Sequence, residues 1–304
     1  MCICTLCFCI SACGRTSAHT PLSSSDKPLI VATIFPYYDF AREIFGDTVE
    51  LHLLVPPGTD SHSYEPTPNQ VALLGECDLF LYTGGEEDGI FEELLASLDA
   101  PVKSLALIES VEPLCEEEHD HGHSHGHDHD HGEYDPHIWT SPQNAMLICE
   151  AIANAGAQFE GFDSRLYEGY LEKLAELDAA FAALFAENDA PLIFADRFPF
   201  RYFAHCYGVE YHAAFPGCAD YTEPSARTVA SLLKTARSHG VTTVFHTEGS
   251  DLSAASCMAD ELGGSYALLH SCHRVTRDEL DGSVGYYSLM KQNLETLTEV
   301  FNAD

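Results

Sequence analysis

The chain has 304 residues, 45% of them hydrophobic, which is enough to bury a large core and to build two lobes of ordinary domain size. Its formal net charge is -34, with 14 Lys and Arg against 48 Asp and Glu. Nucleic acids and anionic lipid surfaces are bound through clustered basic residues, so this charge balance argues against nucleic acid as a partner.

Residues 1–27 are typical of a lipoprotein signal followed by a tether. Five of the 12 cysteines lie within the first 13 residues, in an apolar run that is too short to span a bilayer. The stretch from Ile10 to Cys13 (ISAC) resembles a bacterial lipobox. It predicts lipidation at Cys13 and anchoring at the outer face of the cell membrane. No Lys or Arg precedes the apolar run, which departs from the usual leader.

Short apolar runs alternate with helical patterns in two separate parts of the chain. This rhythm predicts an α/β fold with two lobes, each a parallel sheet flanked by helices. In the first lobe, residues 28–140, the predicted strands are Leu29–Ile34, Leu51–Val55, Leu79–Tyr82 and Val102–Ala106. In the second lobe, residues 190–304, they are Leu192–Ala195, Glu210–Ala213, Val241–His246 and Tyr266–Leu269.

A helical segment, residues 141–189, separates the two lobes. Apolar residues keep the spacing of one helical face at Leu166, Tyr170, Leu174, Leu177, Phe181 and Leu184. No Gly or Pro interrupts Tyr170–Ala190, so we expect one long rigid helix that joins the lobes. A surface helix within one domain is the alternative. A last helix is predicted over Ser288–Phe301, packed on the second lobe.

A histidine-rich loop lies at residues 116–133, near the end of the first lobe. Its seven histidines are His119, His121, His123, His125, His127, His129 and His131. No apolar residue separates them, which predicts a solvated loop rather than regular structure. Between Glu109 and Asp135 ten residues are acidic and none is Lys or Arg. Imidazoles on a flexible loop capture Zn, Ni, Cu or Co without fixed geometry, so this loop predicts accessory metal binding.

Two isolated histidines stand in Pro-rich turns outside this loop. His62 lies in Pro57–Pro66 (PGTDSHSYEP), and His137 lies in Asp135–Pro142 (DPHIWTSP). Both turns follow strand signals. In parallel sheets they are expected near strand ends that face the crevice between the lobes, where open α/β folds bind ligands.

These two motifs, the histidine loop and the long helix resemble the zinc- and manganese-specific substrate-binding proteins of bacterial ABC importers. The resemblance runs from Pro28 to the C-terminus and includes Tyr287–Asn293 (YSLMKQN). It implies that one metal is held in the cleft between the lobes and handed to a membrane permease, with His62 and His137 as first-lobe ligands. Histidine loops at this position favour Zn²⁺ within the family, and nitrogen ligands suit Zn²⁺ better than Mn²⁺, which is the alternative.

The second lobe departs from the family pattern at its third ligand. That ligand is usually a His or Glu opening a motif like HDAFGYF, whereas Ala195–Phe203 here reads ADRFPFRYF. Arg197 cannot bind a metal. The adjacent Asp196 can, or it can pair with Arg197 or Arg201 as a structural group.

The family's fourth ligand is usually an acidic residue after the last strand of the second lobe. Here Leu269–His273 reads LHSCH, and His273 is the first choice for this ligand. Cys272 is an alternative as a thiolate, or it pairs with Cys218 in a disulfide. Glu248 is a weaker candidate, because an acid that ends a strand often caps a helix or meets an Arg. The predicted metal site therefore combines His62 and His137 with Asp196 and His273.

The leading functional hypothesis is a monomeric, lipid-anchored zinc receptor that delivers its ion to an ABC permease and catalyses no reaction. A surface metal buffer or adhesin without a transport role is the first alternative. An exported zinc hydrolase is the second, although the sequence contains neither an HExxH nor a GxSxG run.

Overall fold

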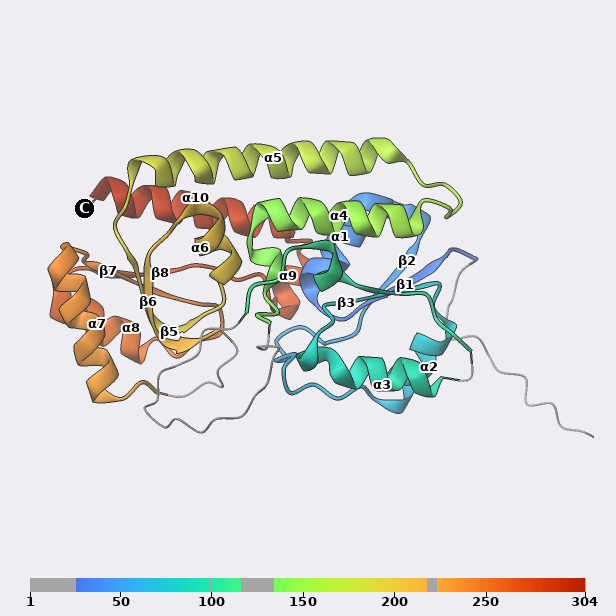
Figure 1. Cartoon of the computed structure of the whole chain (residues 1–304), viewed down its shortest axis with the longest axis horizontal. Helices are drawn as coiled ribbons and strands as arrows, with labels where there is room; N and C mark the ends of the chain where they lie inside the picture. Colours follow the sequence, from blue (N-terminus) through green and yellow to red (C-terminus); the bar gives the residue numbers. More distant parts are fainter. Residues whose placement is uncertain (1–25, 99, 116–133, 218–222, 304) are drawn as a thin grey trace, which may run out of the picture.

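The computed structural model describes residues 26–98, 100–115, 134–217 and 223–303. Cys13, Cys218 and the seven histidines of the loop lie outside these described residues. Two four-stranded parallel sheets lie side by side, and a layer of long helices crosses both of them (Figure 1). The fold class predicted from the alternating apolar runs is therefore confirmed.

The first sheet has the strand order β2-β1-β3-β4. Its strands are β1 (Leu29–Ala32), β2 (Glu50–Leu53), β3 (Leu79–Tyr82) and β4 (Ser104–Ala106). All pairings are parallel. Both central strands, β1 and β3, are buried along their whole length, which explains their uninterrupted apolar sequences LIVA and LFLY. The helices of this lobe are α1 (Phe35–Phe45), α2 (Pro68–Glu76) and α3 (Gly89–Ser97).

The second sheet repeats the pattern with the order β6-β5-β7-β8, again all parallel. Its strands are β5 (Leu192–Phe198), β6 (Tyr211–Pro216), β7 (Thr243–His246) and β8 (Ser265–Leu268). Its helices are α6 (Arg201–Tyr207), α7 (Ala226–His239), α8 (Ser253–Leu262) and α9 (Arg277–Asp281). The register of β5 shifts between Phe194 and Arg197, and β5 extends to Phe198, beyond its predicted end at Ala195. Such irregularities re-aim side chains near binding sites.

Three long helices cover the junction of the lobes: α4 (Pro142–Gly156), α5 (Ser164–Glu187) and α10 (Tyr286–Ala303). Helix α5 contacts α1 and α4 on one side of the junction and α6 on the other, as expected of a helix that joins the lobes. Its buried stripe begins at Tyr170, because Leu166 is 46% exposed. Helix α10 packs more widely than predicted, since it contacts α1 of the first lobe as well as α5 and β8.

One continuous apolar core runs through both lobes beneath these helices. Tyr286 and Trp139 are buried where the lobes meet, and the Tyr286 hydroxyl donates to the Trp139 carbonyl at 2.7 Å. The backbone N–H of Tyr286 also donates to Asp39 Oδ2 at 2.6 Å. The segment just after His137 and helix α1 are thereby both fixed against the start of α10.

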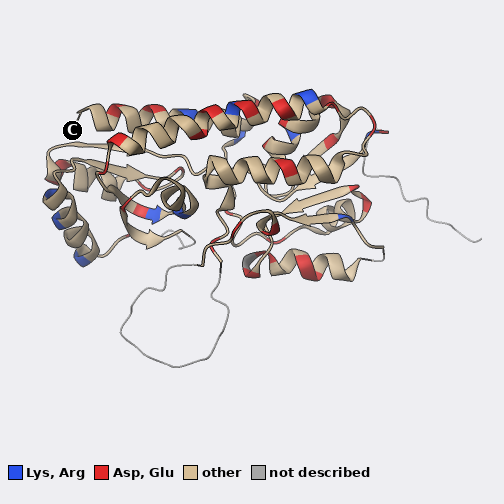
Figure 2. Cartoon of the chain, turned by 45° about the horizontal axis from the view of Figure 1, so that its top comes forward, with Lys and Arg blue, Asp and Glu red and all other residues tan. Residues whose placement is uncertain are grey.

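The charged side chains are distributed unevenly over the helices (Figure 2). Acidic residues are spread along α5 and stand side by side at Glu92 and Glu93 in α3, whereas Arg227, Lys234 and Arg237 gather on α7. None of the helices in the described part of the chain is both long and apolar enough to cross a bilayer.

Candidate metal centre

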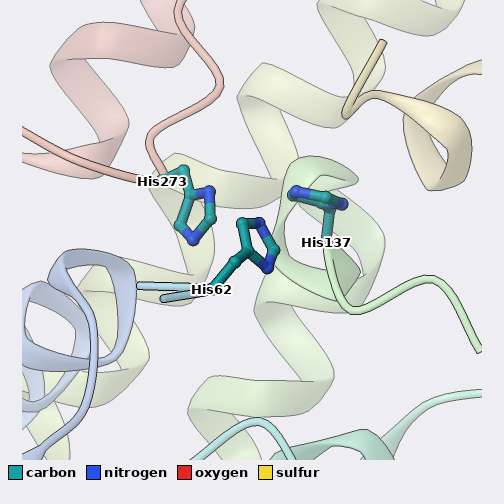
Figure 3. Close-up of side chains that lie close together, drawn as sticks. All are labelled: His62, His137 and His273. Atoms are coloured by element: carbon teal, nitrogen blue, oxygen red, sulfur yellow. The ribbon is translucent and has the colours of Figure 1, made fainter. Parts of the chain in front are cut away.

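Three histidines far apart in the sequence converge at the junction of the two lobes (Figure 3). His62 lies in the loop between β2 and α2, His137 directly precedes the short helix η4 (Ile138–Thr140), and His273 follows β8. One ring nitrogen from each lies within 4.8 Å of the others. Ring centroids are 5.6 Å apart for His62 and His137, 4.8 Å for His62 and His273, and 5.3 Å for His137 and His273.

The backbone of each histidine is fixed by the side chain two residues earlier. Asp and Ser side chains favour such local turns because they bond to a backbone N–H two positions on. The three bonds run from His62 N to Asp60 Oδ1 at 3.1 Å, from His137 N to Asp135 Oδ1 at 2.8 Å, and from His273 N to Ser271 Oγ at 3.2 Å. Each ring is therefore aimed by a turn that is encoded locally.

The ring of His137 is held by a buried carboxylate. Asp135 Oδ1 lies 2.9 Å from His137 Nδ1, and both residues are buried. Because the carboxylate can only accept, Nδ1 donates to it, and in the neutral ring Nε2 is then the nitrogen that carries a free lone pair. That Nε2 is buried and has no hydrogen-bond partner within the described residues. This is how metal-binding histidines are usually oriented, with the ring nitrogen away from the metal donating to a carboxylate.

His273 is neutral at physiological pH. Burial lowers its pKa well below the ordinary 6.5, and the neighbouring His62, His137 and Arg197 lower that pKa further. Its Nε2 lies 2.5 Å from the Ser61 hydroxyl, so this bond joins the first lobe to the second. A neutral imidazole is the form that binds a metal.

The donor set suits a transition-metal ion. Three imidazole nitrogens converge here, and Zn²⁺ takes nitrogen ligands in tetrahedral geometry, so three histidines would leave one further position. A cavity of about 20 Å³ borders the cluster, lined by Ser61, His62, Thr83, Asp88 and His273 among others. That volume is enough for roughly one water molecule, so a small fourth ligand has room there.

The structure does not bring Asp196 to this cluster. Its Oδ2 accepts the backbone N–H of Thr247 at 2.8 Å, the Thr247 hydroxyl at 3.0 Å and the Ser250 hydroxyl. Adjacent residues of a strand point to opposite faces, so Asp196 faces the turn after β7 while its neighbour Arg197 faces Asp60. These bonds favour the structural role for Asp196, with Thr247 and Ser250 rather than an arginine as its partners.

Glu248 supports the cluster without joining it. Its carboxylate accepts from the Ser271 backbone N–H at 2.8 Å and from the Ser271 hydroxyl, which fixes the turn that carries His273. Cys272 is buried with a left-handed φ of 61°, and burial, followed by the charge of Glu248, raises the pKa of its thiol well above the ordinary value. A protonated thiol is a poor metal ligand. Its pairing with Cys218 involves a residue outside the described part of the chain.

The sequence did not predict the residues that support the three histidines, which are Asp60, Ser61, Asp135 and Trp139. The Trp139 indole donates to the Ser271 carbonyl at 2.8 Å and so ties the His137 segment to the His273 turn. A sequence signal existed for the two acids, because an Asp stands two residues before both His62 and His137. No local pattern indicated the contacts of Ser61 and Trp139, which join distant segments.

The fold and the histidine cluster define a two-lobed binding protein with a candidate metal centre between its lobes. The zinc-bound ZnuA-like domain of Streptococcus pneumoniae AdcA has a similar structure, with a TM-score of 0.74 and 27% identity over 90% of this chain and 98% of that one. The fold also matches the metal-dependent lipoprotein YcdH from Bacillus subtilis, with a TM-score of 0.75 and 23% identity over 90% of this chain and 99% of that one.

The family model of the periplasmic zinc-uptake complex component A, ZnuA, matches residues 30–300, and the chain belongs to this family. The high-affinity zinc uptake system protein ZnuA of Bacillus subtilis is 30% identical, over 95% of this chain and 93% of its own length. The zinc-binding lipoprotein AdcA of Streptococcus pneumoniae is 29% identical over 89% of this chain. The chain spans only 55% of AdcA. The resemblance inferred from the two histidine motifs is confirmed.

Proposed function

We propose that this chain is the extracytoplasmic zinc receptor of an ABC importer and binds one Zn²⁺ between its lobes through His62, His137 and His273. The observation that carries the proposal is the convergence of three histidine nitrogens from both lobes within 4.8 Å. Membership of a zinc-uptake family and the zinc-binding names of its relatives support zinc as the ion. Mn²⁺, which accepts oxygen ligands more readily, is the alternative cargo.

The role is binding rather than catalysis. The family is one of uptake-complex components, which supports transport over a surface buffer or adhesin and over an exported hydrolase. The partner that follows from this role is the permease of a metal importer. A binding protein that gives up its ion needs a site that opens by lobe motion, and ligands drawn from both lobes supply that.

We further propose that the receptor is a monomer anchored to the membrane through a lipid on Cys13. The lipobox-like ISAC sequence supports the anchor, and the relative AdcA is named a lipoprotein. Cys13→Ser should move the protein from the membrane fraction to the soluble fraction of cells. Unchanged fractionation would argue against the anchor.

The histidine loop is proposed as an accessory collector that raises the local zinc concentration. Cys115 and Tyr134, which flank residues 116–133 in the sequence, pair in an antiparallel bridge, so the chain can be joined across a deletion of this segment. The loop-deleted protein should bind about one equivalent of Zn²⁺ by calorimetric titration, since the cluster lies outside the loop.

The test of the cleft site adds single substitutions to the loop-deleted protein. His62→Ala or His137→Ala should abolish tight binding, whereas His205→Ala, at an exposed position on α6, should leave it intact. Titration with Mn²⁺ in competition decides between the two metals. The proposal is wrong if the loop-deleted protein binds no zinc, or if His62→Ala leaves the binding unchanged.

A further inference from the structure

The carboxylate of Asp60 joins the loop of His62 to the second lobe. Its Oδ1 accepts the backbone N–H of His62 at 3.1 Å. Its Oδ2 lies 3.6 Å from Nη1 of Arg197 and 3.9 Å from Nη1 of Arg274. Arg197 belongs to β5, and Arg274 directly follows His273. One carboxylate therefore contacts the turn of a first-lobe histidine and two cations of the second lobe.

These ion pairs are partly shielded from solvent. The side chain of Arg197 is 4% exposed, that of Arg274 16% and that of Asp60 27%. Buried pairs are screened less by salt than surface pairs, and removal of one partner reduces the compensation of the charge that stays buried. Burial and the nearby Arg197 lower the pKa of Arg274, whereas Asp60 raises it. Asp60 thus offsets the repulsion between two neighbouring guanidinium groups.

Arg197 stands where the family resemblance places a third metal ligand. A guanidinium cannot bind a metal, so β5 contributes an ion pair across the lobes in place of a metal–ligand bond. The same loop is joined to the second lobe by the bond of Ser61 to His273 at 2.5 Å and by the bond of Gly58 N to the Val275 carbonyl at 2.8 Å. None of these contacts requires a metal.

We propose that Asp60, paired with Arg197 and Arg274, is a latch that positions His62 and holds the lobes together whether or not the metal is bound. The inference rests on the proposed function, because His62 is a ligand only if the cleft binds zinc. In this receptor zinc completes a closed arrangement that the ion pairs already favour.

The chain contains its own probe for this latch. Trp139 is its single tryptophan, with its ring centroid 5.2 Å from that of His273 and 5.5 Å from that of His137. Its indole N–H bonds to the Ser271 carbonyl of the second lobe. When the lobes separate, water reaches the indole and its fluorescence emission shifts to longer wavelength. The emission reports lobe separation in protein that contains no zinc.

The experiment compares full-length wild type with Asp60→Asn, Arg197→Met and the double variant, first with chelator and then with zinc. Asp60→Asn keeps an oxygen for the His62 N–H and replaces the charged oxygen that faces the two guanidinium groups with an uncharged amide NH2. Without metal, both single variants should emit at longer wavelength than wild type. Their zinc affinity, measured by chelator competition, should fall about tenfold. The double variant should bind zinc no more weakly than the single variant with the lower affinity, because both substitutions break the same ion pair. Arg197→Lys should restore most of the loss.

A matched control is Arg237→Met, which removes an exposed cation of α7 and should change neither emission nor affinity. If Arg197→Met fails to fold, Arg274→Met makes the same comparison at a less buried position. The latch is excluded if the metal-free variants emit like wild type, or if the two losses add in the double variant. A wild type that binds no zinc would instead refute the proposed function, and the metal-free emission would still test the latch.

Discussion

One carboxylate oxygen of Asp135 contacts both the backbone and the ring of His137. Asp135 Oδ1 accepts the backbone N–H of His137 at 2.8 Å and lies 2.9 Å from its Nδ1. The same carboxylate thus fixes both the backbone and the ring of a proposed ligand. The carbonyl of Asp135 in turn accepts the Tyr202 hydroxyl at 2.9 Å, so this turn is also held by the second lobe.

Asp135→Ala should therefore weaken zinc binding by about 10- to 100-fold, because the ring of His137 loses its orientation and the basicity that the carboxylate supplies. Asp135→Asn keeps one acceptor oxygen without the charge, and it should lose less. Chelator competition on the loop-deleted protein measures both values. Equal affinities for wild type and Asp135→Ala would show that the pair plays no part in binding.

In the metal-free protein, His273 should lower the free energy of unfolding as the pH falls below about 6.5. Burial lowers the pKa of His273 in the folded state, so the unfolded chain takes up its proton at a higher pH than the folded chain does. Between those two pKa values the unfolded state binds more protons, and the free energy of unfolding falls with falling pH. Above about 6.5 the contribution of His273 to stability is fully present.

Urea titrations of wild type and His273→Gln between pH 7.5 and 5 test this dependence. The comparison is needed because Asp39, whose pKa burial raises to about 6, has the opposite effect: the folded state binds its proton first. Both proteins contain Asp39, so its contribution cancels when their free energies of unfolding are subtracted. A difference in unfolding free energy that stays constant with pH would contradict the assignment to His273.

Much of the fold could be predicted from the sequence because its strands are buried on both faces. Continuous apolar runs such as Leu79–Tyr82 mark such strands without ambiguity, and all eight predicted strands are present. The predicted apolar face of α5 is buried from Tyr170 onward, but its first predicted member, Leu166, is exposed to solvent. Periodicity records which residues share a face and cannot show where the neighbouring helix ends.

The candidate site was less predictable in its second lobe. His62 and His137 stand in distinctive turns, whereas Asp196 and His273 were chosen from segments that depart from the family pattern. Whether Asp196 faced the cleft depended on the register of β5, which shifts between Phe194 and Arg197. The pairing of Arg197 with Asp60 joins residues far apart in the chain, and nothing local to either residue indicates it.

Glu248→Gln should weaken zinc binding by about three- to tenfold while leaving the fold intact. Its carboxylate accepts two bonds from Ser271, and Ser271 Oγ accepts the backbone N–H of His273. The two bonds go to different oxygens and the Gln amide has only one acceptor oxygen, so one of them is lost and the turn that aims His273 loosens. The exposed Glu261→Gln on α8 is the control for loss of an acid. If Glu248→Gln binds zinc as tightly as Glu261→Gln does, Glu248 does not support zinc binding through the His273 turn.

Helix α5 offers a matched pair of leucines that tests its role in joining the lobes. Leu174 is fully buried in the core that both lobes share, while Leu166 near the start of the same helix is 46% exposed. Leu174→Ala should lower the free energy of unfolding by about 2–5 kcal/mol, because it removes buried methyl groups and leaves a cavity. Leu166→Ala should change it by about 0.5 kcal/mol or less. Urea unfolding followed by far-UV circular dichroism measures both changes. Similar losses would mean that the face of α5 beginning at Tyr170 does not carry the packing between the lobes.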